Sequence, residues 1–544
     1  MAGRSEPPAR DAQPAPAGDR RNAGVSMNPI IPIAAPDFTK KAIVVHPSLR
    51  FPPLREGSLK DRGQLRTLLA QSFLRYNWLG MITERSQSLV AIVLAAAAFL
   101  VRLPLCFAGP GFDQDSALVL KKAMLSVLLD KYVPSRGPGY IIPDHIGHLL
   151  APYGWIYLNI LSNFLHSLTI PLFARILDDL KTPNRLWGLT LYAFFPMHII
   201  GYSDVMIDYP LMMLGILLGW WLLNRGNPSL AAASVGIGAA MRPSQGVFFI
   251  LILAFFVVKR FGWKTFGYWL GISVLMLLSF WIIPALLLAD YKLIISYLPY
   301  PFEIVQYMKH IFLRFVGPIG IFPLIVLSVG IIVNWKIILE NTKYNYNLLV
   351  CIITSLIFLM LFFRHPFKSN YLLAMIPFFI YLICISFSER LIKILVFSSV
   401  IHGVVAVPST PPCSPLKPFG EGIIISEYRD RVSFAIGTSR LLTDIPPKST
   451  VLCGPRTIDT MSYNILKDGV QGYEIDIKRN AIHDKKQDRW WIHFRPEIVG
   501  YIKTKKLLRY KIFTTDSLYR RYRGILEQAG ILESAHRLDT SRCQ

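Results

Sequence analysis

Apolar segments of membrane-spanning length recur along the middle of this 544-residue chain, and this feature limits its fold more than any other. A helix needs about 20 apolar residues to cross the hydrocarbon core of a bilayer. Because lipid offers the backbone no hydrogen-bond partner, such a chain is expected to form a bundle of transmembrane helices. We predict about eleven spans. They lie at about 86–107, 152–176, 186–203, 207–223, 229–240, 243–258, 265–289, 315–334, 347–363, 370–387 and 391–408.

The composition agrees with a membrane protein. Hydrophobic residues make up 53% of the chain and charged residues 17%, whereas a soluble domain carries about 25% charged residues. The net charge of +24 suits contact with anionic lipid headgroups and lipid phosphates. Nucleic acid is not expected as a partner, because no basic helix with interleaved aromatic residues accompanies this charge. The six cysteines show no CxxC or metal-binding spacing, so they predict no metal site.

The chain divides into three predicted regions. Residues 1–85 are polar and are expected to form a largely disordered cytoplasmic tail. Residues 86–408 form the transmembrane domain. Residues 409–544 begin with a proline-rich linker and continue with alternating apolar segments such as Ser449 to Cys453. About 130 residues can bury their own core, so this last region predicts a small soluble α/β domain.

Basic residues in the short loops predict the orientation of the chain. Loops rich in Lys and Arg stay in the cytoplasm, which places the first long loop and the C-terminal domain outside, or in the periplasm of a cell with an inner membrane. The loops on the predicted cytoplasmic side carry Lys181, Arg185, Arg225, Lys259, Arg260, Lys264, Lys336, Lys343, Arg390 and Lys393, and those on the other side carry fewer, chiefly Arg242, Lys292, Lys309, Arg364 and Lys368.

Two carboxylates open the first outer loop, within the run Gly111-Phe112-Asp113-Gln114-Asp115-Ser116. A carboxylate held at the membrane surface can deprotonate a hydroxyl group or bind a cation. The alternative is that Asp113 and Asp115 only cap the helix that follows. That predicted helix, from Ala117 to Leu129, carries Lys121 and Lys122 on one face, which is typical of an amphipathic helix at a membrane interface.

Other charged residues lie at the same predicted face of the membrane. Arg136 stands in a Gly/Pro-rich turn, and its guanidinium fork matches a phosphate group. Ionisable groups at membrane depth are usually functional, although at helix ends they can also extend harmlessly to water. Together they fit a phosphate-bearing lipid substrate and an acceptor that needs a base. The remaining candidates are His145, Asp204, Asp208, Arg242 and Lys368.

Missing motifs exclude several classes of function. The chain has no GxxxxGK[ST] loop, no strand-associated GxGxxG, no HExxH and no GxSxG, which gives no support to nucleotide-driven transport or zinc proteolysis. Nucleotide sugars are scarce outside the cytoplasm. An external glycosyl donor would therefore be linked to a lipid.

The order of these motifs resembles the GT-C glycosyltransferases, in particular the bacterial branch related to protein O-mannosyltransferases and the aminoarabinose transferase of lipid A. The resemblance covers about residues 86–408. It is carried by Phe112-Asp113-Gln114 before Lys121-Lys122-Ala123-Met124-Leu125, by Arg136-Gly137-Pro138-Gly139-Tyr140, by Asp208-Tyr209-Pro210-Leu211, by Arg242-Pro243-Ser244-Gln245-Gly246, and by Lys368-Ser369-Asn370-Tyr371-Leu372-Leu373 closing at Pro377. Gln114 stands where the family commonly has Glu, which leaves open whether Asp115 takes part of that role.

The resemblance implies an inverting transferase that moves a sugar from a polyprenyl-phosphate donor to a lipid, glycan or protein acceptor. Asp113 would be the general base, with Asp115 as a second catalytic candidate. The lipid phosphate would be bound by Arg136, Arg242, Lys368 and Tyr371, and the acceptor would be oriented by Asp208 and His145. The sequence predicts no certain cofactor, and a divalent cation is left open. A lipid or glycan transporter or flippase, and a ligase that transfers a preassembled glycan, also remain open.

Overall fold

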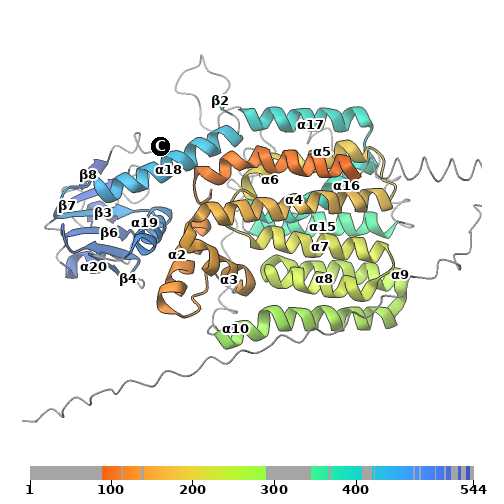
Figure 1. Ribbon diagram of the computed structural model, residues 1–544, viewed down its shortest axis with the longest axis horizontal. Coiled ribbons are helices and arrows are strands. Elements are labelled where there is room, and N and C mark those ends of the chain that lie inside the picture. Colours follow the sequence, from red (N-terminus) through yellow and green to blue (C-terminus); the bar gives the residue numbers. More distant parts are fainter. Residues whose placement is uncertain are drawn as a thin grey trace, which may run out of the picture. The chain divides into compact units, whose positions relative to one another are not determined.

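A computed structural model of the chain describes residues 88–111, 114–136, 140–288, 345–364, 369–406, 420–421 and 423–469, and most of 472–538 with short gaps. The described part is mostly helical and contains one small mixed sheet (Figure 1). The tail predicted at 1–85, the span predicted at 315–334, Asp113 and Lys368 lie outside the described residues.

The described residues between 88 and 404 form mainly a bundle of apolar helices. In chain order its helices are Ser88–Ala108, α4 (Trp155–Asp179), α5 (Arg185–Phe194), α6 (Pro196–Gly201), α7 (Asp208–Asn224), α8 (Pro228–Met241), α9 (Pro243–Leu277), the π-turn η2 (Leu278–Ile282), α10 (Ile283–Leu288), α15 (Tyr346–Arg364), the 3-10 helix η4 (Ser369–Met375), α16 (Ile376–Ser386) and α17 (Glu389–Val404).

Three helices in the described part of the chain are long and apolar enough to cross a membrane: Ser88–Ala108, Trp155–Asp179 and the continuous run Pro243–Leu288. The last run bends at Gly262, whose φ of 83° breaks the helix. This bend falls between the spans predicted at 243–258 and 265–289. The larger number of about eleven spans stays a prediction.

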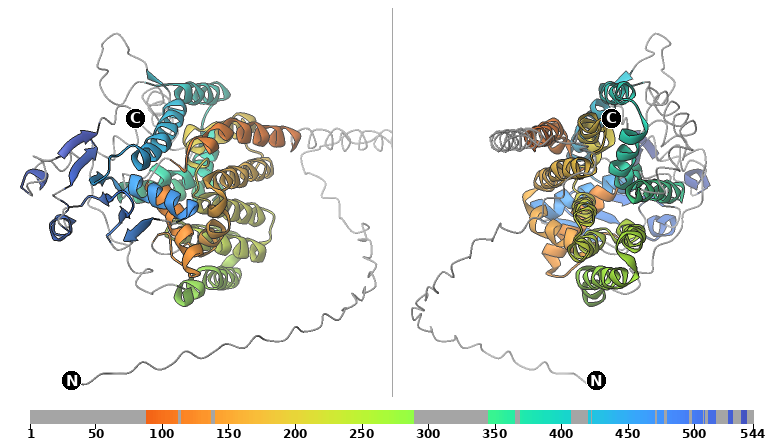
Figure 2. Two further views of the ribbon diagram at one scale, coloured as in Figure 1. Left: turned by 60° about the vertical axis from the view of Figure 1, so that its left-hand side comes forward. Right: turned by 90° about the vertical axis from the view of Figure 1, so that its right-hand side faces the viewer.

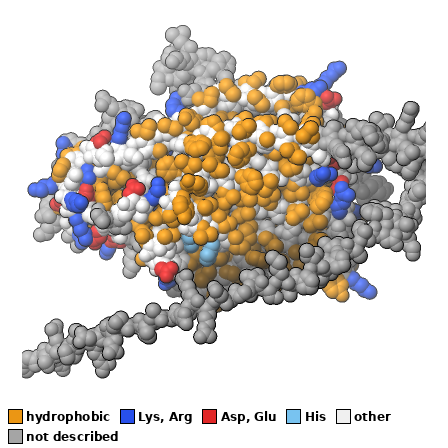
Figure 3. Space-filling model, in the orientation of Figure 1, with side chains coloured by type: hydrophobic (Ala, Val, Ile, Leu, Met, Phe, Trp, Pro, Cys, Tyr) orange, Lys and Arg blue, Asp and Glu red, His pale blue; other side chains and the backbone are white. Residues whose placement is uncertain are grey.

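Small residues let α7, α8 and α9 pack closely. A Cβ atom on Gly215 of α7 would lie 2.6 Å from the Cα of Gly238 on α8, and one on Gly246 of α9 would meet the backbone of Ala239. Such close backbone approach is how helices associate where lipid gives no hydrophobic driving force. Hydrophobic side chains also cover the face of the bundle that is seen in Figure 3, and on this face Lys and Arg lie mainly toward the ends of the bundle.

The segment predicted as the first outer loop holds α2 (Gln114–Leu129), α3 (Ile141–Leu150) and the short 3-10 turn η1 (Ala151–Tyr153). The helix predicted from Ala117 is therefore present and begins three residues earlier. Its expected basic face does not lie free for lipid headgroups, because Lys121 is buried and forms an ion pair with Asp459 of the C-terminal region. The side of α2 that carries Lys121 is a protein contact.

The C-terminal region folds as an α/β domain. Its elements are α18 (Ile423–Thr443), β3 (Ser449–Cys453), α19 (Pro455–Asp468), β4 (Tyr473–Asp476), β5 (Ala481–Asp484), β6 (Arg489–His493), α20 (Val499–Thr504), β7 (Lys511–Thr515) and β8 (Ala535–Leu538). A separate two-stranded ladder pairs β1 (Val405–Ala406) with β2 (Gly420–Glu421).

The six-stranded sheet has the order β4-β5-β6-β3-β7-β8. β3 pairs in parallel with β6 on one side and β7 on the other, and all five of its residues are buried. A central parallel strand is covered on both faces. The alternating apolar pattern expected for Ser449–Cys453 therefore does not mark one face of the strand as exposed to solvent. Leu452 belongs to the core on one face of the sheet and Val451 to the core on the other.

Candidate functional site

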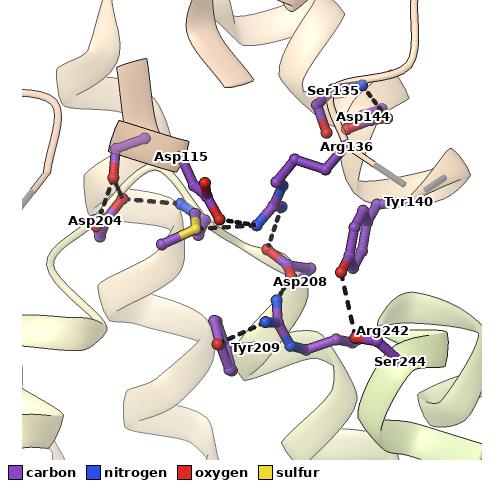
Figure 4. A network of polar contacts seen from close by, with 12 residues as sticks. Asp115, Ser135, Arg136, Tyr140, Asp144, Asp204, Asp208, Tyr209, Arg242 and Ser244 are labelled. Carbon is purple, nitrogen blue, oxygen red and sulfur yellow. Dashed lines mark hydrogen bonds and ion pairs between the residues drawn. The ribbon is translucent and has the colours of Figure 1, made fainter. Parts of the chain in front are cut away.

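A buried network of carboxylates and arginines lies where α7 begins and where α8 turns into α9 (Figure 4). Its centre is Asp208, the first residue of α7, which is 1% exposed. Its Oδ1 accepts a hydrogen bond of 3.2 Å from Nη2 of Arg136, and its Oδ2 forms an ion pair with Nη1 of Arg242. One buried carboxylate therefore holds two guanidinium groups together, although they lie 106 residues apart in sequence, the difference between 242 and 136.

Arg242 is held at the break between two helices. It ends α8, and Pro243 starts α9 after it. Its Nη2 donates to the hydroxyl of Tyr209 at 2.6 Å, and its Nε donates to Gln245 at 3.3 Å. With its Nη1 on Asp208, the guanidinium has a partner on each of its three nitrogens, so Arg242 is fixed in place.

Arg136 has fewer partners. Its guanidinium lies 4.4 Å from the ring centre of Tyr140, and its Nη1 donates to the sulfur of Met206. Asp115 approaches it only to 3.9 Å. Among the described residues, nothing accepts a hydrogen bond from the buried Nε. Among the described residues, Arg136 thus keeps one unused donor, its buried Nε.

Electrostatic interactions keep Arg136 charged. Burial by itself would lower the pKa of Arg136, but the nearby Asp208, Tyr140 and Asp115 raise it well above its ordinary value. A cation that stays charged at any working pH is suited to bind an anionic group.

Asp144 on α3 fixes the turn that carries Arg136. Its Oδ2 accepts the backbone N–H of Ser135 at 3.1 Å and the hydroxyl of Tyr132 at 2.8 Å. Burial raises the pKa of Asp144, and these hydrogen bonds and Arg136 oppose the rise. The residue before Arg136 is therefore tied to the helix that follows it.

A second carboxylate, Asp204, supports the start of the first outer loop. Its two oxygens accept the hydroxyl of Ser116 at 2.9 and 2.8 Å. Gly111 packs directly against it: a Cβ on Gly111 would lie 2.5 Å from the Asp204 carboxylate, and the φ of +147° there disfavours other residues. The glycine at the head of the loop is thus required by the close approach of Asp204.

The structure brings together four of the residues predicted from sequence: Asp115, Arg136, Asp208 and Arg242. Asp208, expected to orient an acceptor, is occupied by the two arginines. Tyr371 is buried at 7% exposure in η4. Asp113 and Lys368 lie outside the described residues.

His145 lies apart from this network. It is exposed on α3, its Nδ1 pairs with the carbonyl of Ile141, and its ring stacks on Tyr132 with centroids 5.4 Å apart. The described contacts thus give it no direct link to the arginines.

Tyr209 and Tyr140 belong to the network but were not predicted as separate site residues. Both stand next to or within motifs that the sequence offered, Asp208-Tyr209-Pro210-Leu211 and the segment that ends at Tyr140. Tyrosines in such apolar surroundings are most often core residues. Only their contacts with Arg136 and Arg242 identify Tyr140 and Tyr209 as members of the network. In the described part of the chain, no three His, Cys, Asp or Glu side chains come together as a metal site.

No protein-family model matches this chain, and no curated protein or solved structure matches it significantly.

Proposed function

We propose that this protein is a membrane glycosyltransferase of the GT-C type, which transfers a sugar from a polyprenyl-phosphate donor to an acceptor at the outer face of the membrane. The observation that carries the proposal is the pair of arginines held on Asp208 at one end of an apolar bundle. A phosphate at the boundary of a low-dielectric region needs fixed cations. Arg136 offers an unused Nε donor at that place.

In this proposal a lipid phosphate binds to Arg136 beside Asp115. Asp115 is 3.9 Å from Arg136, and its side chain is 20% exposed. Two oxygens of a phosphate group can form a shorter, bidentate contact with a guanidinium. The buried Asp208 would stay in place, because removing it would leave two buried cations without their shared partner.

The proposed reaction is a single displacement with inversion. The acceptor hydroxyl loses its proton to Asp113 and forms a bond to the anomeric carbon. The bond between that carbon and the phosphate oxygen breaks, and polyprenyl phosphate leaves with the electron pair. General-base assistance contributes about 100- to 10,000-fold. Arg136, Arg242 and Lys368 would stabilise the leaving phosphate, Tyr371 would line its site, and Asp115 is the second candidate for the base.

One observation favours a second candidate, a lipid or glycan transporter or flippase. Arg102 is fully buried within the helix Ser88–Ala108 and donates to Asn163 at 3.3 Å and to the carbonyl of Ala193 at 2.8 Å. Charged groups inside spans are typical of transport pathways. The two candidates differ in chemistry, because a transporter moves its lipid without cleaving it.

The test of the proposed function is the release of polyprenyl phosphate. Purified full chain in lipid vesicles is incubated with a panel of polyprenyl-phosphate sugars and with lipid, glycan and peptide acceptors. We expect one donor to be cleaved, and Arg136→Gln to lower turnover by about 100-fold or more. Arg185→Gln is the matched control, since Arg185 pairs with Asp178 away from the network. Movement of the intact donor from one leaflet of the vesicle membrane to the other, with no cleavage of any donor, would show that the protein is a transporter or flippase instead.

A further inference from the structure

One face of α19 in the C-terminal domain lies against the first outer loop. Arg456, Asp459 and Tyr463 stand three and four residues apart, which puts them on the same side of a helix. Nη2 of Arg456 donates to the carbonyl of Gly111 at 2.5 Å, and the Tyr463 hydroxyl donates to the carbonyl of Ala151 at 3.0 Å. The further views show α19 beside α2 (Figure 2).

Asp459, between these two residues on α19, pairs with Lys121 of α2. Lys121 Nζ lies 2.9 Å from Asp459 Oδ1, and both side chains are 3% exposed. Lys121 also donates to Asn480, whose own amide donates to Asp459 at 3.2 Å. A charge buried to this extent is costly without its partner, so the pair ties α2 to the domain specifically.

The two elements also share an apolar core. Val119, Leu120 and Ala123 of α2 are in one buried cluster with Tyr463 and Leu466 of α19. Apolar surface that is buried between two elements holds them together in proportion to its area. The first outer loop and the C-terminal domain therefore share one hydrophobic core.

A second arginine, Arg431 of α18, reaches the segment before Asp204. It is fully buried. Its Nη1 donates to the carbonyl of Ser203 at 2.6 Å, and its Nη2 donates to the carbonyl of Ile200 at 3.0 Å. Its Nε pairs with Glu427 at 2.8 Å, so the guanidinium is held from its own helix.

These contacts meet at one point. Arg456 holds Gly111 and Arg431 holds Ser203, while Gly111 packs against Asp204, the residue that follows Ser203. We propose that the C-terminal domain completes the candidate site, with Arg456 and Arg431 as positioning residues that fix the contact between Gly111 and Asp204. The expected effect on kcat rests on the proposed function, whereas the expected effect on the structure of the loop does not.

The kinetic test uses Arg456→Gln in the full chain. If the side chain positions the loop, kcat falls by about 10- to 100-fold, as expected for a small misplacement of reacting groups. The KM for the donor changes by less than about threefold, because the arginines at Asp208 are untouched. Arg456→Lys, which can still donate to the Gly111 carbonyl, recovers part of kcat. Arg479→Gln is the matched control, since Arg479 is an exposed arginine of the same domain that pairs with Asp476.

A structural measurement separates this inference from the proposed function. Hydrogen exchange of peptides that cover 105–118 should become faster in Arg456→Gln and stay unchanged in Arg479→Gln, whatever reaction the protein performs. Tyr463→Phe, which removes only one hydroxyl, gives a second, milder variant if Arg456→Gln does not fold. Faster exchange in a chain that cleaves no donor would support the positioning role and contradict the glycosyltransferase. Unchanged exchange and unchanged kcat in both variants would overturn the inference.

Discussion

Asp208 is the residue on which the network depends, because its two oxygens serve two different arginines. Removing one member of a buried ion pair leaves an uncompensated charge, and this is usually much more costly than losing a surface pair. Here one substitution would leave two such charges. The stability of the site and its ability to bind an anion are therefore linked through a single carboxylate.

We predict that Asp208→Asn lowers the free energy of unfolding by about 3–5 kcal/mol. Asp178→Asn is the matched control, because Asp178 also pairs with an arginine but its side chain is 30% exposed and that of Arg185 is 34% exposed. The control should cost about 1 kcal/mol or less. Thermal unfolding of both purified variants in the same detergent measures the difference. Equal losses would mean that the two arginines do not depend on Asp208.

Gly111 offers a second prediction. A Cβ there would lie 2.5 Å from the Asp204 carboxylate, in a backbone conformation that side chains rarely adopt. We expect Gly111→Ala to lower turnover by about tenfold or more, since the loop must shift away from Asp204. Gly267→Ala is the control, because a Cβ at Gly267 would meet no atom within 4 Å. Initial rates of donor cleavage by both variants provide the test, and an unaffected Gly111→Ala would contradict the requirement for glycine.

The sequence identified the charged residues of the site better than their roles. Asp208 and Arg242 could be selected because they lie at the ends of predicted spans, where several ionisable groups gather. Asp115 could be selected as one of two carboxylates that open the first loop, and Arg136 because it stands in a Gly/Pro-rich turn. That Asp208 holds both arginines could not be predicted, because their convergence depends on how α7, α8 and the first loop pack. The resemblance to GT-C enzymes gave the order of the motifs, and it remains an interpretation of function.

At the scale of elements, α2 shows that a local sequence pattern does not identify the partner of a charged helix face. Lys121 and Lys122 on one helix face predict a contact with lipid headgroups. The partner of Lys121 is Asp459, 338 residues further along the chain. No periodicity within α2 can distinguish a phosphate group from a carboxylate of a distant domain. In contrast, the α/β class of the C-terminal region followed from its alternating apolar segments and its length, which can be read from the sequence of that region alone.

The contact between α2 and the C-terminal domain makes a prediction about pH. Burial, together with the nearby Arg495 and Lys121, lowers the pKa of His493 from 6.5 to about 4, and Asp459 opposes this only in part. The unfolded chain therefore takes up the proton at a higher pH than the folded chain. The stability that His493 contributes is complete above about pH 6.5 and is lost as the pH falls toward 4.

We expect the free energy of unfolding to fall by about 1–2 kcal/mol between pH 7 and pH 5 through His493, since partial exposure reduces the effect of the full shift. His493→Gln cannot titrate and should make the curve flatter over this range. Chemical unfolding of the wild type and the variant at a series of pH values gives the comparison. Parallel curves would show that His493 titrates alike in the folded and unfolded chain.

At the scale of the whole molecule, the ends of the helices differ in charge. Arg225 at the end of α7 pairs with Asp179 at the end of α4 at 2.6 Å, and Arg260 of α9 donates to the carbonyl of Asn224 at 3.0 Å. Lys393 of α17 pairs with Glu389, which also accepts the indole N–H of Trp187 on α5. One group of these contacts thus joins α4, α7 and α9, and another joins α5 and α17.

The network around Asp208 lies at the other ends of two of these helices. α7 runs from Asp208 to Asn224, and α9 starts at Pro243, next to Arg242. Among the described residues, the predicted cytoplasmic loops around Lys181 and Arg225 are therefore at the end of the bundle opposite the arginine network, and the loop with Lys336 and Lys343 lies outside the described residues. The arrangement agrees with the predicted division of the loops into two sides, and the side of the membrane on which each lies stays a prediction.

The orientation of the chain is the last prediction. Loops rich in Lys and Arg remain in the cytoplasm, so the end with Arg225 and Arg260 should face inward, and the network and the C-terminal domain outward. Single cysteines placed at Lys60, Lys181 and Lys485, in a chain without Cys413 and Cys543, can be labelled in intact cells with a thiol reagent that does not cross the membrane. We expect labelling at Lys485→Cys alone, with the other two labelled only after the cells are opened. Lys181 follows the C-terminal end of α4, whereas Lys485 belongs to the domain that contacts Ala151, just before the N-terminal end of α4. Labelling of both in intact cells would therefore contradict the assignment of sides. Labelling of both Lys60→Cys and Lys181→Cys without Lys485→Cys would reverse it, and a site facing the cytoplasm would have access to nucleotide sugars, so the argument for a lipid-linked donor would fail with it.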